Sequence, residues 1–423
     1  MKMLTLKKIL NQQALRQIIL SFGFRIITPF IMLVTTPALI SNLGYRDYGA
    51  WSLLITTMGW LTICDFGLTN QVRNESKVLF INNKNYEVRE LFTTASIISS
   101  LLCVIFVFIL YLTHLDIIYK LFLAVSFFLV IQVNLCRAVL LSINKPEIAT
   151  AIVNIPNLIM LLFVMFASDF DLKRIMLVYT IGCILMLFIS YLLIVKDNVK
   201  LSMVFFKVQS LKDSLNKYSI LKGGFGFFTV QIVSMALVLS DRYIIAYLFG
   251  NDQVSKYDII FKVANFCIMF FSVINTVLWS KFTELWIKKE FEKIRKIFRV
   301  FDLLAMSLVI ILFASLHYIN IIIEIWLGVK DIHYDLNYIA GVVLYLLGFY
   351  IMSAYSSFLN GSGIIKPQFV LQLIVLIIKV ALLIIPIYIF KIDNVNSVIY
   401  IGGSCLCLAG VLFRGKAYAQ VRT

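Results

Sequence analysis

The chain has 423 residues, of which 61% are hydrophobic and only 14% are charged, and its formal net charge at pH 7 is +16. Soluble domains carry about 25% charged residues, so this composition excludes an ordinary soluble protein. In so apolar a chain, the excess of Lys and Arg indicates loops that face anionic lipid and not a nucleic-acid-binding surface.

Hydrophobic stretches along the chain predict twelve membrane spans. A helix needs about 20 apolar residues to cross a hydrocarbon core of about 30 Å, and stretches such as Ile175–Val195 contain no charge. The lipid interior offers no hydrogen-bond partner to a backbone, so these spans must be helices. The predicted spans are 14–40, 48–70, 91–112, 117–142, 148–168, 175–195, 224–248, 255–279, 303–323, 337–359, 368–390 and 394–413.

The loops between these spans differ in charge. Of the 38 Lys and Arg residues, 26 lie in the two termini and in the loops that follow even-numbered spans, 8 lie on the opposite side, and 4 lie within spans. By the positive-inside rule, both termini are expected in the cytoplasm. The first span is too long for a signal peptide and no small-residue cleavage site follows it, so we expect it to be a membrane helix.

The two longest cytoplasmic loops, 196–223 and 281–302, carry apolar residues at spacings of three and four. This pattern predicts two basic amphipathic helices. Each is suited to lying in the plane of the lipid headgroups, or to acting as a strut between the two halves of the bundle.

An internal repeat relates the two halves of the chain. The motif Phe-Gly-Phe starts at position 22 and is followed by a glycine at 44 and a tyrosine at 48; it starts again at 225, followed by a glycine at 250 and a tyrosine at 257. We therefore predict an all-α polytopic membrane protein with two six-helix lobes around a central cavity, as in many transporters. The predicted lobes are 1–196 and 224–423, joined by a cytoplasmic amphipathic linker at 197–223.

Four cations lie within the predicted spans: Arg25, Arg137, Lys262 and Lys379. A charge at the bilayer centre costs roughly 3 kcal/mol on insertion scales, so each should face water or a partner. Arg25 and Lys379 have no acidic neighbour in their own helices, which favours a cationic lumen that binds an anionic substrate; an arginine fork suits phosphate. The alternative is internal ion pairing, such as Lys262 with Asp258 four residues earlier.

Residues for soluble-enzyme chemistry are not arranged in any usual pattern. All seven cysteines fall inside spans without metal-ligand spacing, and the three histidines are scattered. The sequence shows no nucleophile triad and no glycine-rich phosphate loop. We expect no cofactor, no metal and no enzymatic activity.

Three stretches carry a resemblance to a known family. Asn42–Leu54 (NLGYRDYGAWSLL) followed by Asp65–Leu68 (DFGL) resembles the opening of bacterial polysaccharide flippases of the O-antigen type, and Asp241–Ile245 (DRYII) resembles the start of their second lobe. That family belongs to the multidrug/oligosaccharidyl-lipid/polysaccharide superfamily. The resemblance implies two lobes in a V around a hydrophilic, often cationic cavity.

The resemblance also implies a substrate: an oligosaccharide repeat unit on undecaprenyl pyrophosphate, moved from the cytoplasmic to the periplasmic leaflet of the cell inner membrane for O-antigen or a related surface polysaccharide. Membrane lipids, and the polymerase and chain-length regulator of the same pathway, are its candidate partners; nucleic acid is not. Asp65 and Asp241 are candidates for ion coupling, and the alternative for both is a helix cap or an ion pair. The peptidoglycan-precursor branch typically has two further helices, which this sequence does not show.

Two other functions remain open. An ion-coupled exporter of cationic small molecules could use the same scaffold, but it would need acidic residues deep in the cavity. A membrane-embedded polysaccharide polymerase or ligase would need a long outer loop, and the predicted outer loops have mostly 4 to 14 residues.

Overall fold

The computed structural model describes residues 12–62, 65–143, 145–167, 169–196, 225–315, 318–328, 332–390 and 394–422. In this part of the chain the regular structure is entirely helical. The contacts divide the chain into two compact units, Met1–Leu43 with Leu54–Phe228 and Gly44–Leu53 with Thr229–Thr423. The predicted linker 197–223 lies outside the described residues. The predicted lobes therefore differ from the units at two described segments, since Gly44–Leu53 groups with the second unit and residues 225–228 group with the first.

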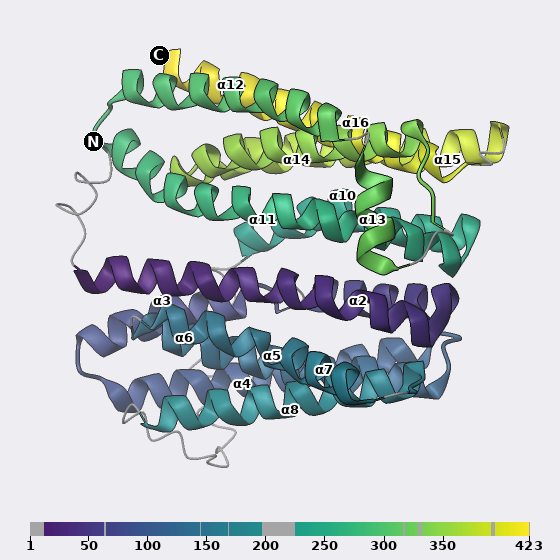
Figure 1. Ribbon diagram of the computed structural model, residues 1–423. Coiled ribbons are helices and arrows are strands. Elements are labelled where there is room, and N and C mark those ends of the chain that lie inside the picture. The colour runs from purple at the N-terminus through teal and green to yellow at the C-terminus, as the bar shows by residue number, and fades with distance from the viewer. Residues whose placement is uncertain are drawn as a thin grey trace. The chain divides into compact units, whose positions relative to one another are not determined.

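The first unit is a bundle whose helices run roughly along one direction (Figure 1). Its core is formed by α5, which packs against α3, α4 and α8, while α7 packs against α8. Leu91, Leu135 and Cys183 are among the fully buried residues that join these helices. The bounds are α2 Gln12–Leu61, α3 Leu68–Ile81, α4 Asn85–Tyr111, α5 Ile117–Ser142, α6 Pro146–Ala151, the 3-10 helix η1 Ile152–Asn154, α7 Ile155–Phe166 and α8 Leu172–Lys196.

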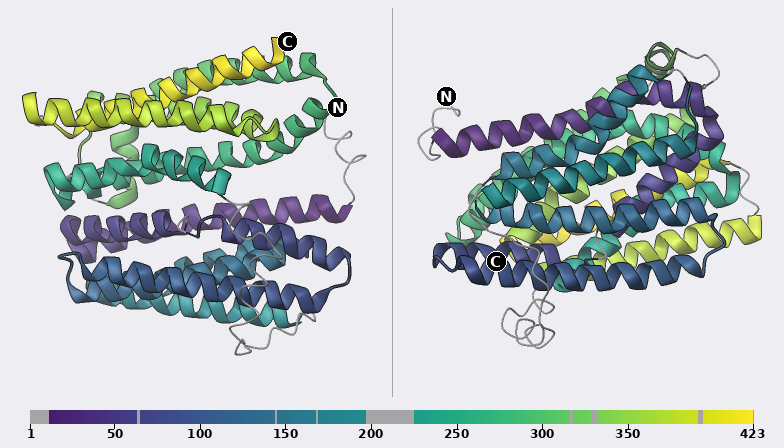
Figure 2. Two further views of the ribbon diagram at one scale, coloured as in Figure 1. Left: turned by 180° about the vertical axis from the view of Figure 1, so that it is seen from behind. Right: turned by 90° about the horizontal axis from the view of Figure 1, so that it is seen from below.

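In the second unit α14 packs closely along α16, and α11, α12 and α15 pack around this pair. The short α13 runs steeply across the other helices (Figures 1 and 2). The bounds are α10 Phe225–Phe249, α11 Asn251–Ile287, α12 Phe291–Ser315, α13 Ile319–Leu327, α14 Leu336–Gly361, α15 Ile365–Phe390 and α16 Val395–Arg422.

Glycines allow the close approach of α14 and α16. A Cβ on Gly348 would lie 2.5 Å from the backbone nitrogen of Cys407, and one on Gly403 would lie 2.8 Å from that of Tyr345. Helices in lipid gain little from the hydrophobic effect and associate through such small-residue contacts, which bring their backbones together.

Nine of the described helices are long and apolar enough to cross a membrane, so the chain is a multi-pass membrane protein. Each of the twelve predicted spans overlaps a described helix, and the two-lobe bundle is consistent with the structure. The 50-residue α2 contains the first predicted span and residues 48–61 of the second. At 1.5 Å per residue it would be about 75 Å long if straight, more than twice the hydrocarbon core.

The two glycines of the internal repeat have the same structural role. Gly44 interrupts α2 with φ 70° and ψ 173°, and Gly250 separates α10 from α11 with φ 83°. Such backbone conformations are essentially restricted to glycine. The repeat therefore marks, in each half of the chain, the break between two consecutive helices.

The structure corrects several predicted boundaries. The second span, 48–70, is too long: α2 ends at Leu61 and α3 begins after Gly67, whose φ is 79°. The fifth span, 148–168, is not one regular helix, because Pro156 has no N–H to donate to the carbonyl of Ile152 and the chain forms the 3-10 turn η1 there. The ninth, 303–323, is divided between α12 and α13.

The amphipathic segment 281–302 does not form a separate helix on the membrane surface. α11 continues to Ile287 and α12 begins at Phe291. Ile294, Phe298 and Phe301 are buried, and Phe298 packs against rings of other helices, including Phe358. The apolar face is covered by protein, so the segment is an extension of two long helices.

Candidate functional site

Arg137 in α5 and Arg25 in α2 lie close together in the first unit. The Arg137 side chain is half-buried; its Nε donates to the carbonyl of Ala149 at 2.8 Å and its Nη1 donates to Asn134 Oδ1 at 2.9 Å. Arg25 is exposed, and its charge is near enough to act on Arg137. The two guanidiniums therefore lie within electrostatic range of each other, and that of Arg137 is oriented by neutral oxygens.

Asn154 joins this pair of arginines to the break in the fifth span. Its amide nitrogen donates at 2.9 Å to the carbonyl of Phe24, directly before Arg25, and its amide oxygen accepts from the Thr28 hydroxyl. Asn154 is the last residue of η1, so the break caused by Pro156 places it against α2. The sequence prediction missed Asn154, although a polar residue two positions before an intramembrane proline was a usable signal.

Lys379 in α15 forms a buried ion pair with Asp241 in α10. The Lys379 Nζ lies 2.7 Å from Asp241 Oδ1, and both side chains are about 1% exposed. The same ammonium donates to the carbonyl of Leu237 at 2.6 Å and to Ser240 Oγ at 3.1 Å. α16 approaches this pair at Gly402, where a Cβ would lie 2.7 Å from Asp241 Oδ2.

The polar face of α15 is turned into the second unit. Gln368 and Gln372 are, like Lys379, about 1% exposed. Gln372 accepts a hydrogen bond from Ser234, and Gln368 donates one to Ser356. The arrangement corresponds to the ion-pairing alternative for Lys379, and its role in binding substrate stays a prediction.

A second ionic cluster surrounds Asp258 in α11. Its two carboxylate oxygens accept from Arg242 Nη2 and from the Tyr48 hydroxyl, each at 2.7 Å. Lys262 lies 3.5 Å from the same carboxylate and also donates to the Tyr48 hydroxyl. The internal pairing of Lys262 with Asp258 is thus confirmed. Because Asp241 and Arg242 are adjacent in α10, the second unit contains a run of three cations and two carboxylates.

The segment Gly44–Leu53 is joined to the second unit by the residues of the motif at Asn42–Leu54. The Ser255 hydroxyl donates to the carbonyl of Tyr45, Tyr48 is fully buried, and a Cβ on Gly49 would collide with the carbonyl of Asn251. Sequence reasoning noted Tyr48 as part of the repeat but not as a partner of Asp258, because the two are 210 residues apart.

Asp65 lies at the start of α3. Its carboxylate accepts from the backbone N–H of Gly67 at 2.9 Å and of Thr69 at 3.0 Å. The amides at a helix N-terminus lack partners within the helix, so Asp65 satisfies them. This is the helix-cap alternative, and it accounts for the Asp-Phe-Gly-Leu motif; ion coupling through Asp65 stays a prediction.

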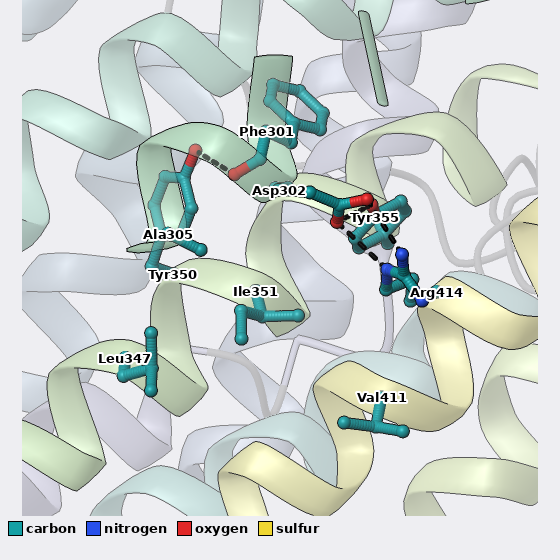
Figure 3. Close-up of a pocket in the computed structure, with 10 residues that line it drawn as sticks. Phe301, Asp302, Ala305, Leu347, Tyr350, Ile351, Tyr355, Val411 and Arg414 are labelled. Atoms are coloured by element: carbon teal, nitrogen blue, oxygen red, sulfur yellow. Dashed lines mark hydrogen bonds and ion pairs between the residues drawn. The ribbon is translucent and has the colours of Figure 1, made fainter. Parts of the chain in front are cut away.

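A cavity of about 340 Å³ lies between α12, α14 and α16 of the second unit (Figure 3). At one end Arg414 binds Asp302 through two hydrogen bonds of 2.9 and 2.8 Å. Tyr355 also donates to Asp302, at 2.6 Å. Burial raises the pKa of Asp302, but the hydrogen bonds from Arg414 and the tyrosines outweigh it and hold this pKa below its ordinary value. The carboxylate is therefore ionised and balances the charge of Arg414.

Groups of three or more His, Cys, Asp or Glu side chains that could hold a metal ion are absent from the described residues. The candidate site residues that the structure describes are instead mainly cations, with the partners given above. Arg137 of the first unit binds neutral oxygens, while Lys262 and Lys379 of the second unit bind aspartates.

The sequence is similar to two bacterial proteins over most of its length. It is 23% identical over 379 residues to a protein of Yersinia pseudotuberculosis named for O-antigen export, covering 83% of this chain and 84% of the relative. It is 24% identical over 355 residues to a protein of Salmonella typhimurium named as an O-antigen transporter, covering 76% of each chain. No protein-family model matches the chain.

Solved structures share the fold. An inward-facing multidrug-resistance MATE family transporter of the MOP superfamily aligns with a TM-score of 0.73 at 11% identity, over 95% of this chain and 98% of its own. A MOP superfamily transporter from Pyrococcus furiosus, described as having a binding pocket of reversed polarity, aligns with a TM-score of 0.64 at 12% identity, over 96% and 95%. The chain resembles O-antigen transporters in sequence and has the MATE transporter fold.

Proposed function

We propose that this protein is a flippase of the inner membrane that moves undecaprenyl-pyrophosphate-linked oligosaccharide repeat units from the cytoplasmic to the periplasmic leaflet, for O-antigen or a related surface polysaccharide. Its support comes from the membrane-spanning helices, the transporter fold, and the sequence relatives named for O-antigen export. We also propose that the protein has no enzymatic activity of its own.

The arginine pair is the observation that carries the proposal. Two adjacent like charges repel, and an anion between them would remove the repulsion. Arginine forks can bind several oxygens of a pyrophosphate at once. Lys262 and Lys379 of the second unit are paired with aspartates, whereas the printed partners of Arg137 are neutral oxygens, so we place the multiply charged headgroup at the Arg25–Arg137 region.

The depth of the two arginines suits a substrate that enters from the cytoplasm. Arg25 lies about eleven residues from the predicted cytoplasmic end of its span, and Arg137 about five from the cytoplasmic end of its own. At 1.5 Å per residue these positions are roughly 17 and 8 Å deep. Arg137 is therefore in the cytoplasmic half of the membrane and Arg25 is near its middle.

The physical barrier to flipping is the headgroup and not the lipid tail. The undecaprenyl chain can remain in hydrocarbon throughout, while hydroxyls and a charged pyrophosphate cannot leave water without replacement partners. The arginines would supply those partners, and alternating access of the two lobes would then expose the headgroup on the outer side. Asp65 and Asp241 are the candidates for coupling this cycle to an ion gradient.

The test is surface polysaccharide measured beside membrane abundance in a strain that lacks the native gene. Arg25→Ala is expected to lower surface polysaccharide at least tenfold at normal abundance, with accumulation of lipid-linked repeat units on the cytoplasmic side. Arg25→Lys should rescue only part of the loss, because an ammonium lacks the bidentate fork. Arg73→Ala, which removes an exposed arginine of α3, is the matched control and should leave polysaccharide unchanged. Normal polysaccharide in the double variant Arg25→Ala, Arg137→Gln would refute an anion site here.

The orientation can be checked in a cysteine-free variant. A cysteine at Tyr86, which is 77% exposed in the first turn of α4, is expected to react with a membrane-impermeant maleimide only after the membrane is opened. A cysteine at the exposed His333 should react in cells whose inner membrane is intact. Reaction of the cysteine at 86 from the periplasmic side would reverse the proposed topology.

Two alternatives are less well supported. Multidrug transporters share the fold, but an exporter of cations would gain nothing from adjacent arginines at the binding site. A polymerase or ligase would be expected to produce long chains from exported repeat units. If repeat units reached the periplasmic side normally in the deletion strain, this outcome would favour that class.

A further inference from the structure

One short segment of the first unit contacts both helices that carry the two arginines. It comprises residues 149–154, the end of α6 and the 3-10 helix η1. The carbonyl of Ala149 accepts from Arg137 Nε at 2.8 Å, and the side chain of Asn154 bonds α2 in the turn that contains Arg25. The positions of both guanidiniums therefore depend on this segment.

The side chain of Asn154 is only 3% exposed, and both of its polar atoms are engaged. Its Nδ2 donates at 2.9 Å to the carbonyl of Phe24, and its Oδ1 accepts from the hydroxyl of Thr28. These two partners are about one helical turn apart and lie on either side of Arg25 in the sequence. The amide therefore fixes where this turn of α2 lies against η1.

The hydroxyl of Thr28 bonds outside its own helix although an internal partner exists. A threonine in a helix can donate to the carbonyl four residues earlier, and for Thr28 that carbonyl is Phe24, which accepts from Asn154. Six other described threonines make the internal bond: Thr35, Thr36, Thr93, Thr94, Thr150 and Thr180. The bond from Thr28 is thus a specific contact between two segments and not the usual helical one.

The helix break places Asn154 against α2. A 3-10 helix turns 120° per residue where an α-helix turns 100°, so the three residues of η1 rotate Asn154 by about 60° relative to a regular helix. The break is also packed tightly against α8, because a Cβ on Gly182 would lie 2.7 Å from the Cα of Pro156. α8 therefore supports the segment that in turn holds α2.

We propose that Asn154 is a positioning residue for the headgroup site: it fixes Arg25 relative to Arg137 in the arrangement that binds pyrophosphate. The inference rests on the proposed function for the identity of the ligand. Asn154 acts on the ligand only through Arg25. A guanidinium that is held in place before the ligand arrives loses less freedom on binding, so affinity is higher.

The position of α2 is measured as the distance between two spin labels on the full-length protein. The labels are attached to cysteines that replace Phe30 of α2 and Phe188 of α8, which are 60% and 59% exposed, in a cysteine-free variant. Asn154→Ala and Thr28→Val should broaden or shift the distance distribution. Thr28→Ser keeps the hydroxyl and should give the wild-type distribution.

Two substitutions elsewhere in the first unit are matched controls. Thr180→Val removes a threonine hydroxyl that donates within its own helix, to the carbonyl of Met176. Asn157→Ala removes an asparagine amide of α7 three residues along from Asn154. Both controls should leave the distance distribution and the ligand affinity as in wild type.

The affinity for inorganic pyrophosphate, titrated calorimetrically into the purified full-length protein, shows whether Asn154 acts through Arg25. Asn154→Ala should lower it about tenfold, the loss expected from two interhelical hydrogen bonds of ordinary strength. In an Arg25→Ala background the same substitution should change it less than about twofold, because the group that Asn154 positions is gone. Thr28→Ser should bind as wild type does.

An unchanged distance distribution in Asn154→Ala overturns the proposal. An equal loss of pyrophosphate affinity with and without Arg25 also overturns it, because Asn154 would then act on the fold and not through the arginine. If wild type binds no pyrophosphate, the headgroup site of the proposed function is refuted, and the distance distribution still decides whether Asn154 fixes α2.

Discussion

Replacing Lys379 by alanine is expected to remove most of the protein from the membrane, and a second replacement, Asp241→Ala, is expected to restore much of it. The ammonium and carboxylate are both about 1% exposed and lie 2.7 Å apart. Removing one partner of such a pair leaves a buried charge without compensation, at a cost of about 3–5 kcal/mol. Removing both leaves a small cavity but no buried charge, so the double variant should be more stable than either single variant.

The measurement is membrane abundance and thermal unfolding in detergent for the two single variants and the double variant. Lys84→Ala is the control, because Lys84 forms an ion pair with Glu87 whose side chains are 53% and 24% exposed, and such surface pairs contribute about 0–1 kcal/mol. If the double variant is as unstable as Lys379→Ala, then the ion pair is not what keeps Lys379 in the protein.

The same double variant tests the predicted ion coupling through Asp241. It has no titratable group at either position and is expected to remain folded. If Asp241 couples transport to a proton gradient, transport by this variant should no longer respond when the gradient is collapsed. Unchanged dependence on the gradient at normal abundance would exclude Asp241 as the coupling residue and leave it a structural role.

Gly49→Ala is expected to disrupt the second unit although it adds a single methyl group. A Cβ at this position would collide with the carbonyl of Asn251, a backbone atom that no rotamer change can move. Overpacking of this kind typically costs 1–3 kcal/mol, and here it would also displace Tyr45 and Tyr48 from Ser255 and Asp258. The melting temperature in detergent should fall and membrane abundance should drop.

Gly415→Ala in α16 is the matched control for this substitution. A Cβ there would meet no atom within 4 Å, and alanine is favoured over glycine in a helix interior by about 0.5–1 kcal/mol. The control should leave the melting temperature unchanged or raise it slightly. Equal effects of the two substitutions would show that Gly49 is not required for close packing.

The motifs at Asn42–Leu54 and Asp65–Leu68 contribute to the fold, and the residues proposed to bind substrate lie elsewhere in the chain. The residues from Gly44 to Gly49 form a helix break, a buried hydrogen bond and a close backbone contact, and Asp65 accepts hydrogen bonds from the amides of Gly67 and Thr69 at the start of α3. These motifs identify the family resemblance because the fold requires them. The residues proposed to bind substrate, Arg25 and Arg137, lie outside both stretches.

The sequence by itself determined the class of the protein, the approximate positions of its membrane helices, the two-lobe repeat and the resemblance to O-antigen transporters. These properties depend on local hydrophobicity and on short motifs, and the lipid core permits few backbone structures. Only the tertiary structure decided which polar residues meet. It joined Lys379 to Asp241, 138 positions away, grouped Gly44–Leu53 with the second unit, and brought Arg25 within electrostatic range of Arg137. The physical reason is that helical periodicity fixes which residues share a face, whereas the partner of that face depends on helices packed from distant parts of the chain.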